Sequence, residues 1–444
     1  MTRRAAGFSG LVLGYLLAGC SPAADPVEPP EAPPPDETTG NPADTVQRGS
    51  LTVTVTAAGE ESRAIEALGT PIDRVPQAHV SIRRLSESPV EAGTTDSLGQ
   101  VTFAGLLPGR YEITSLRLLS EDEGIHIAEA DSALAGINAL GGGGRVQVQP
   151  PASTIEVEAV AGRRGSLSIS EIHDWMPELT SDVEGQYSMA RYVEVYNNAD
   201  TTVFLDGKIL GSALEFVWES SLNETSLNHC EDLKRWRLDR DGIWSDMHLR
   251  FPGSGREHPV SPGGVRTVAL QAIDHREVHP GPGLPNLSTA DFEIVGTGHD
   301  VDNPAVPNME HIGLRPSVDA LGRGFIGHFP ALFIVDEVDL HSLPTEKLHT
   351  LRDPEYRRFP GDKILDLVTV NFDPATFGLE GRFCDRVVGE TFERQAAAIL
   401  DPGAGNSIHR RVLGTTASGQ VVLQRTRTSA VDLVRGARSP GRVP

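Results

Sequence analysis

Residues 51–56 alternate strictly between apolar and β-branched polar side chains, in the order Leu-Thr-Val-Thr-Val-Thr. A period of two residues places the apolar side chains on one face of an extended chain, which is typical of a strand with one buried face. Further short runs of this kind occupy residues 78–82 and 167–172, with turn-forming residues between them. The repetition of this pattern predicts an all-β fold.

Turn residues at regular spacing support this prediction. Asp96 and Gly99 are spaced for a turn, and Pro108-Gly109 suits a type II turn because proline fixes φ and glycine accepts a positive φ. The four glycines at residues 141–144 are not followed by Lys-Ser or Lys-Thr, so they form no phosphate-binding loop. We expect them to form a hairpin or loop before a strand at residues 146–148.

The segment at residues 95–113 combines a T-D-x-x-G turn with an L-P-G-x-Y turn. This segment resembles the transthyretin-like β-sandwich of carboxypeptidase regulatory-like modules, over about residues 49–118. Such modules are usually non-catalytic spacers or docking units. The resemblance implies a first β-sandwich domain, which we place at residues 49–160.

Four later segments resemble lamin-tail domains, which are small immunoglobulin-like β-sandwiches: SISEI, YVEVYNNADTTVFLDG, SPGGVRTVALQA and SAVDL. The segments LSTADFE, DVDNPAVPNM and YRRFPGDKILDLV fit an uncharacterised family of bacterial surface lipoproteins. In that family a lamin-tail-like domain with long insertions follows a carboxypeptidase regulatory-like module. The resemblance implies a second β-sandwich at residues 165–444, whose insertions near 212–250 and 310–410 would carry loops and short helices.

The N-terminus has the layout of an export signal: two arginines, an apolar run at residues 8–19 and then Leu-Ala-Gly-Cys. The last four residues resemble the lipobox of bacterial lipoproteins. This implies a signal peptide at residues 1–19 and a diacylglyceryl group on Cys20. An ordinary signal peptide with an incidental cysteine is the alternative. Ser21 after the cysteine implies the cell outer membrane by the sorting habit of many lipoproteins, while the periplasmic or surface face stays open.

Residues 20–48 are predicted to be a disordered, lipidated tether. Between residues 21 and 48 the sequence holds eight prolines and six acidic residues. Such a stretch cannot bury enough apolar surface to fold. Proline-rich chains extend by ~3.1 Å per residue, so the tether would reach roughly 80 Å from the membrane.

Charge and cysteine content limit the partners and the metal sites. The net charge of −22 repels phosphate backbones, so we expect no nucleic-acid partner. Besides Cys20, only Cys230 and Cys384 are present, and in an oxidising compartment we expect them to form a disulfide. Two separate buried thiols are the alternative. With so few cysteines, a thiolate-rich zinc site is excluded.

Two groups of residues are candidate ligand sites. Asp300 and Asp302 offer hard oxygens suited to calcium, although the spacing that follows them is not that of an EF-hand. Trp218, Trp236 and Trp244 cluster in sequence, either as core anchors or as an aromatic platform for a sugar or hydrophobic ligand. The alternative for the aspartates is a solvated loop.

No spacing of serine, histidine or carboxylate residues selects a catalytic group. We therefore expect an outer-membrane-anchored lipoprotein with a non-enzymatic binding or interaction role and no cofactor, calcium alone being left open. Its partners would be the membrane, through the N-terminal lipid anchor, and an outer-membrane protein. The alternatives are a metal- or calcium-dependent hydrolase and a ligand-capture subunit of an outer-membrane transporter.

Overall fold

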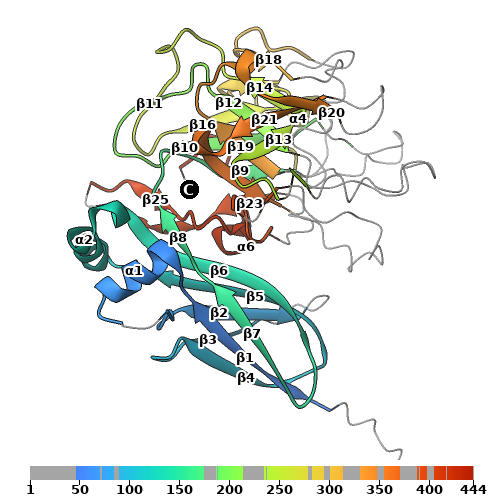
Figure 1. Cartoon of the computed structure of the whole chain (residues 1–444). Coiled ribbons are helices and arrows are strands. Elements are labelled where there is room, and N and C mark those ends of the chain that lie inside the picture. Colours follow the sequence, from blue (N-terminus) through green and yellow to red (C-terminus); the bar gives the residue numbers. More distant parts are fainter. Residues whose placement is uncertain are drawn as a thin grey trace, which may run out of the picture. The chain divides into compact units, whose positions relative to one another are not determined.

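The computed structural model describes most of the chain beyond residue 46 (Figure 1). The described residues are 47–70, 73–84, 90–174, 187, 189–213, 235–236, 238–278, 283–294, 301–313, 331–347, 355–370, 388–389, 391–397, 405–416 and 418–443. The predicted signal peptide, Cys20, the candidate disulfide Cys230–Cys384, Asp300 and Trp218 lie outside them.

Residues 49–163 form two sheets and two short α-helices (Figure 1). The strands are β1 (Gly49–Thr56), β2 (His79–Arg84), β3 (Val90–Thr94), β4 (Gln100–Leu106), β5 (Gly109–Leu118), β6 (Ile137–Val148), β7 (Ala152–Glu158) and β8 (Val160–Arg163). The helices are α1 (Gly59–Ala67), α2 (Glu121–Ala130) and the 3-10 turn η1 (Ser132–Leu134). The sheet orders are β4-β1-β7 and β3-β2-β5-β6-β8.

The alternation at residues 51–56 does form a strand with one face in a core. Leu51 and Val53 of β1 are fully buried and belong to the same apolar cluster as Val80 of β2 and Ile113 of β5. The two sheets therefore pack face to face, as in a sandwich. The predicted turn also forms, because the Gly99 N–H donates to the carbonyl oxygen of Asp96 at 3.0 Å, with φ of 70° at Gly99.

The prediction of a loop at the four glycines is wrong, because β6 runs through all of them and pairs with β5. Other parts of the chain approach these glycines too closely for a side chain. A Cβ atom at Gly141 would lie 2.7 Å from the side chain of Thr426, and one at Gly142 would lie 2.7 Å from the carbonyl oxygen of Glu158. These glycines therefore allow other segments to pack closely against β6, and they do not form a turn.

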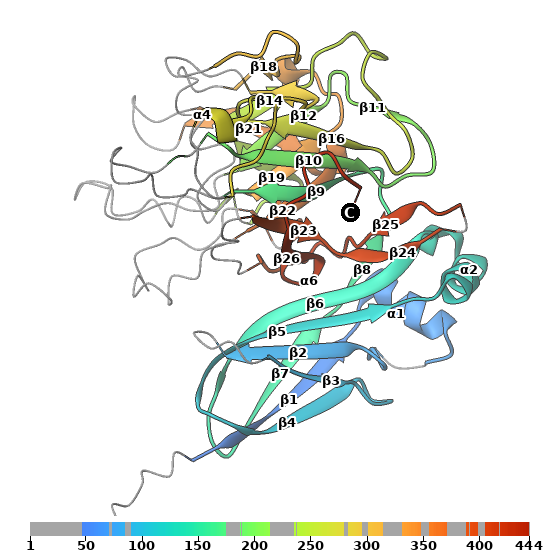
Figure 2. The same ribbon diagram turned by 180° about the vertical axis from the view of Figure 1, so that it is seen from behind.

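Residues 167–437 form a second group of sheets, seen from behind in Figure 2. Its longer strands are β9 (Leu167–His173), β10 (Tyr192–Asn197), β12 (Ile209–Ala213), β13 (Gly242–Ser245), β14 (Met247–Arg250), β16 (Val265–Ala269), β19 (Ala331–Val335), β21 (Glu355–Pro360), β22 (Ile364–Thr369), β23 (Asn406–Arg410), β24 (Val412–Thr415) and β26 (Leu433–Ala437). The short ones are β11 (Val203–Phe204), β15 (Pro259–Val260), β17 (Phe292–Glu293), β18 (Glu310–His311), β20 (Thr345–Lys347) and β25 (Val421–Leu423). The helical turns are α4 (His275–Val278), η4 (Leu340–Ser342), η5 (Gly361–Lys363) and α6 (Ser429–Asp432).

Two large sheets of this group share one core. Their strand orders are β17-β16-β10-β9-β23-β26 and β18-β14-β12-β19-β22. Ile169 of β9 and Val195 of β10 lie in the same apolar cluster as Leu210 of β12 and Ile334 of β19. A smaller sheet, β13-β21-β20, lies beside them, and β11-β15 and β24-β25 are two-stranded.

This arrangement corrects the prediction for the two insertions. We expected loops and short helices near residues 212–250 and 310–410, but β14, β19 and β22 are strands of the second large sheet. The run Ala331–Val335 is buried at every position, because its sheet lies between the main core and a second apolar cluster. The described residues 391–397 likewise form no helix.

The chain is therefore all-β, with few and short helices. Among the described residues, no helix has the length and apolar character needed to cross a bilayer. In this part of the chain, strands before residue 164 pair only with one another, as do strands after residue 166. The domain limits at 49–160 and 165–444 stay a prediction.

Candidate functional site

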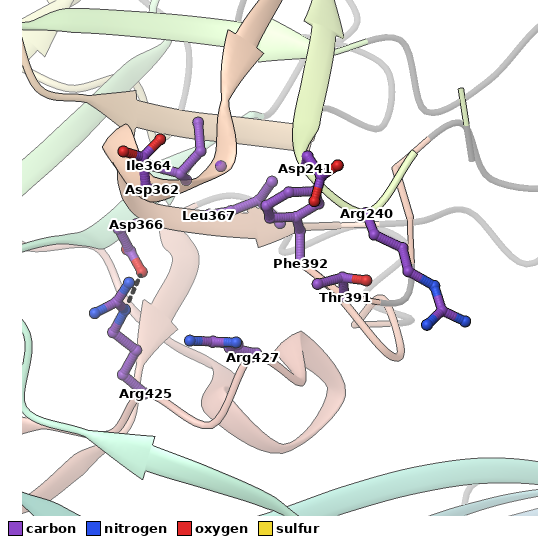
Figure 3. A pocket seen from close by; sticks show the side chains of 11 residues that line it. Arg240, Asp241, Asp362, Ile364, Asp366, Leu367, Thr391, Phe392, Arg425 and Arg427 are labelled. Atoms are coloured by element: carbon purple, nitrogen blue, oxygen red, sulfur yellow. Dashed lines mark hydrogen bonds and ion pairs between the residues drawn. The ribbon is translucent and has the colours of Figure 1, made fainter. Parts of the chain in front are cut away.

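A cavity of about 360 Å³ lies where the start of β13, the end of β21 and the segment before α6 come together (Figure 3). Its polar walls are formed by three arginines, three aspartates and one threonine: Arg240, Asp241, Asp362, Asp366, Thr391, Arg425 and Arg427. Ile364, Leu367 and Phe392 supply the apolar surface.

Asp366 anchors one side of the cavity. Its carboxylate is buried on β22 and accepts hydrogen bonds from Arg410 Nη2 at 2.5 Å and from Arg425 Nε at 3.1 Å. The backbone N–H of Ile169 on β9 donates to the same carboxylate at 2.7 Å. One carboxylate thus holds two guanidinium groups in place, and Arg410 also pairs with the buried Asp432 at 3.5 Å.

Arg427 occupies an unusual backbone position beside this pair. Its φ is 53°, in the left-handed region that a residue with a side chain rarely adopts. Its guanidinium makes no hydrogen bond or ion pair within the described part of the chain. Desolvation, followed by the positive charge of Arg425, lowers the pKa of Arg427 from its ordinary value. Arginine still remains charged at neutral pH, so this cation would gain from an anionic partner.

The loop at Asp239–Asp241 brings Arg240 to the opposite wall. Asp239 accepts from Arg358 Nε at 2.5 Å and Nη2 at 2.6 Å, and from Trp244 Nε1 at 3.1 Å. The carbonyl oxygen of Asp241 accepts the N–H of Gly361 at 2.7 Å. Strands β13 and β21 therefore fix this loop, while Arg240 itself is exposed and makes no ion pair with another described residue.

Charges of both signs line the cavity, and two of its arginines face two of its aspartates. In Figure 3, Arg425 and Arg427 lie on one side, and the exposed carboxylates of Asp241 and Asp362 lie on the other, with Phe392 between them. Guanidinium groups only donate hydrogen bonds, and carboxylates only accept them. A ligand that fits both sides needs an anionic or acceptor group and, across from it, hydroxyl or ammonium donors.

The predicted aromatic cluster lies next to this cavity without lining it. Trp236 is buried and stacks on Trp244 with ring centroids 5.1 Å apart and an interplanar angle of 10°. Its ring also lies 4.7 Å from that of Tyr356 on β21. In this geometry Trp236 and Trp244 act as packing anchors, and Trp244 also supports the Asp239 loop through its indole N–H.

Asp302, the described half of the calcium prediction, is exposed. Its Oδ1 accepts a hydrogen bond from the side-chain amide of Asn308 at 3.1 Å. Since Asp300 lies outside the described residues, the calcium site stays a prediction. Residues 275–278 form the turn α4, and His275 is buried with its Nδ1 2.7 Å from the hydroxyl of Tyr187.

Another group with metal-ligand chemistry consists of Asp206, Glu257 and His258, whose candidate ligand atoms lie within 4.8 Å of one another. Asp206 Oδ1 already accepts the N–H of Glu257 at 2.7 Å, and its Oδ2 accepts the N–H of His258 at 2.9 Å. These backbone hydrogen bonds outweigh desolvation and hold the pKa of Asp206 below its ordinary value. The Asp206 carboxylate thus stabilises the loop that contains Glu257 and His258.

No protein-family model matches the sequence, and a search among curated proteins found no match. A DUF4876 family protein from Bacteroides thetaiotaomicron is similar in structure, with TM-score 0.47, 16% identity, and coverage of 89% of this chain and 98% of that chain. A DUF3823 family protein from Parabacteroides merdae has TM-score 0.16 and 7% identity over 51% of this chain and 82% of its own. Fervidolysin from Fervidobacterium pennivorans, a keratinolytic enzyme related to subtilisin, has TM-score 0.18 and 19% identity over 37% and 27%. At these TM-scores the likenesses carry no inference about function.

Sequence reasoning missed the arginines of the cavity. Arg240 precedes β13, and Arg425 and Arg427 belong to a segment after β25, so only the fold brings them together. One local signal was available: Arg425-Thr426-Arg427 alternates two cations with a small polar residue in a strongly acidic chain. Such a repeat concentrates positive charge where the composition otherwise disfavours it.

Proposed function

We propose that this chain is an exported, non-enzymatic binding protein whose ligand places an anionic group in the cavity between Arg240 and Arg427. The observation that carries the proposal is the Arg427 guanidinium, which makes no hydrogen bond or ion pair with another described residue and feels the positive charge of the already paired Arg425. Holding Arg427 in the left-handed region costs about 1–3 kcal/mol of folding free energy. Backbone strain of this kind tends to cluster at functional sites.

The charge of the whole chain strengthens this argument. At −22, the protein repels anions over most of its surface, so an anion site must be built from local cations. Arg240 and Arg427 supply guanidinium groups that can donate paired hydrogen bonds to a carboxylate, sulfate or phosphate. The acids Asp241 and Asp362 on the facing side favour a ligand that also carries hydroxyl groups.

We propose binding and not catalysis because no spacing of serine, histidine or carboxylate residues in the sequence selects a catalytic group. The wider setting of the proposal rests on the sequence: lipid attachment at Cys20, a disordered tether and an outer-membrane location. Modules like the carboxypeptidase regulatory-like and lamin-tail domains, which the sequence resembles, would fit a spacer followed by a binding unit.

The proposal is tested by titrating the full chain, purified in detergent, with galacturonate, inorganic phosphate and neutral galactose in a calorimeter. We expect saturable one-site binding of the acidic sugar and weaker or no binding of galactose. The R427Q variant should bind about 10- to 100-fold more weakly, because a hydrogen bond to a charged group contributes roughly 1.5–3 kcal/mol.

The matched control is R435Q, which removes one positive charge from an exposed arginine of β26 that makes no hydrogen bond or ion pair with another described residue and lies outside the cavity. It should retain the affinity of the natural chain. Equal losses in R427Q and R435Q would mean that only the net charge matters, and would contradict the cavity as the site.

A further inference from the structure

A second cavity adjoins the first. Its volume is about 740 Å³, roughly twice that of the first, and both cavities are lined by Arg240, Thr391 and Arg427. Arg427 therefore stands at the passage from one to the other. A ligand whose anionic group is held there has room to continue into the larger space.

The second cavity has a different chemistry. It adds three carboxylates, Glu60, Glu61 and Glu158, and one more guanidinium, Arg394. Each carboxylate is already fixed: Glu60 by Arg163 at 2.8 Å, Glu61 by the N–H of Ala161 at 2.9 Å, and Glu158 by Arg394 at 3.0 Å. A carboxylate has about four acceptor positions, so each keeps capacity for a ligand's donors.

Backbone is also accessible at the edge of this space. Gly143 and Gly144 of β6 line the cavity without side chains. Their peptide groups widen the range of hydrogen bonds that a bound chain could make. The surface is thus a fixed mixture of donors and acceptors, to which Val160 and Leu238 add an apolar part.

This mixture selects the class of ligand. A bare polyanion such as polyphosphate would meet Arg427 but be repelled by the three glutamates. A neutral polyol would suit the glutamates but offer no anionic group to Arg240 and Arg427. A chain that carries acidic groups and many hydroxyls satisfies both, because hydroxyls donate as well as accept.

We propose that the ligand is an acidic oligosaccharide, with one acidic sugar in the first cavity and further sugar units in the second. This inference rests on the proposed function and names its ligand class. It also assigns a binding role to the Glu158–Arg394 ion pair, which the first cavity does not include.

The test compares galacturonate with its dimer, tetramer and hexamer by calorimetry on the full chain. Affinity should rise at least tenfold from the single sugar to the tetramer. R427Q should weaken all of them, whereas R394Q should weaken the tetramer by at least fivefold and leave the single sugar unchanged. E158Q, on the other side of the ion pair, should act like R394Q, and R435Q should act on none.

Urea unfolding of each variant verifies that it is folded before its affinity is compared. If the single sugar binds and depends on Arg427 but length adds nothing, the oligosaccharide inference is overturned and the proposed function stands. Tighter binding of tripolyphosphate or a poly-glutamate peptide than of the tetramer would also overturn it. If no anion binds, the proposed function itself fails.

Discussion

Glu171 on β9 lies directly opposite Glu194 on β10, and both carboxyl groups are buried. The hydroxyl of Ser407 donates to Glu171, while the hydroxyl of Thr267 donates to Glu194 Oε1 at 3.0 Å. The N–H of Gly441, close to the C-terminal end of the sequence, donates to the same oxygen of Glu194. Burial, and then the negative charge of Glu171, raise the pKa of Glu194 to about 8.

This pair predicts that the protein loses stability as the pH rises from about 4 to about 8. Between the ordinary glutamate pKa of about 4.3 and the raised value, the folded state binds one more proton than the unfolded state. The free energy of unfolding therefore falls as the pH rises through this window, by on the order of 5 kcal/mol, and this contribution stays constant above it. E194Q should remove most of this fall, as measured by urea unfolding at pH 5, 7 and 9.

A suitable control for this measurement is E129Q, which changes an exposed glutamate on α2. The free energy of unfolding of E129Q should change with pH in the same way as that of the natural chain. An E194Q variant whose stability fell with pH as steeply as that of the natural chain would argue against a protonated Glu194.

G142A should destabilise the protein by about 1–3 kcal/mol, because the added methyl group overpacks a filled space. Its Cβ would lie 2.7 Å from the backbone oxygen of Glu158 and 2.9 Å from Val157 Cγ1. G414A on β24 is the matched change, since nothing lies within 4 Å of the Cβ position there. Equal midpoints of urea unfolding for the two variants would refute the close-approach explanation of the glycine run.

D366N should cost about 3 kcal/mol, since it removes the charge of the nearer of the two carboxylates that pair with the buried Arg410 and leaves only Asp432. The variant should also loosen Arg425 and weaken binding in the cavity. D362N, four residues earlier on the exposed rim, removes the same charge and should change stability by less than about 0.5 kcal/mol. Chemical unfolding of both proteins at pH 7 provides the comparison.

D239N should weaken ligand binding about tenfold without unfolding the protein. The change removes the charge that pairs with Arg358 and holds the loop of Arg240, at a cost of about 1 kcal/mol in stability. D302N, an exposed aspartate outside the cavity, should leave affinity unaltered. Undiminished binding of galacturonate by D239N would show that the loop needs no such support.

The strands that were predicted well are those whose signal is local. Leu51–Thr56 shows its buried face by alternation alone, and the Asn197-Asn198 turn forms with the N–H of Ala199 donating to Asn197 Oδ1 at 3.0 Å. Ala331–Val335 has no alternation because both of its faces are buried. A run of this kind does not reveal its sheet from sequence, so it was assigned to an insertion.

The glycine run and the cavity could not be predicted, for a different reason. What forbids a side chain at Gly141 is Thr426, which is remote in sequence. Likewise, Arg240, Asp362 and Arg427 come from three separate segments. No local sequence pattern indicates these contacts, because they form only when segments that are remote in sequence come together in the folded protein.

The pairing of β9 has a consequence for the order in which the chain matures. Its two neighbours are β10, a short distance along the chain, and β23, which begins only at Asn406. During synthesis, β9 therefore keeps one edge unpaired until the segment that contains β23 has been made. Open edges recruit strands from other chains. Fragments that stop before residue 406 should consequently aggregate, and this half of the chain can complete its sheet only after nearly all of it has been synthesised.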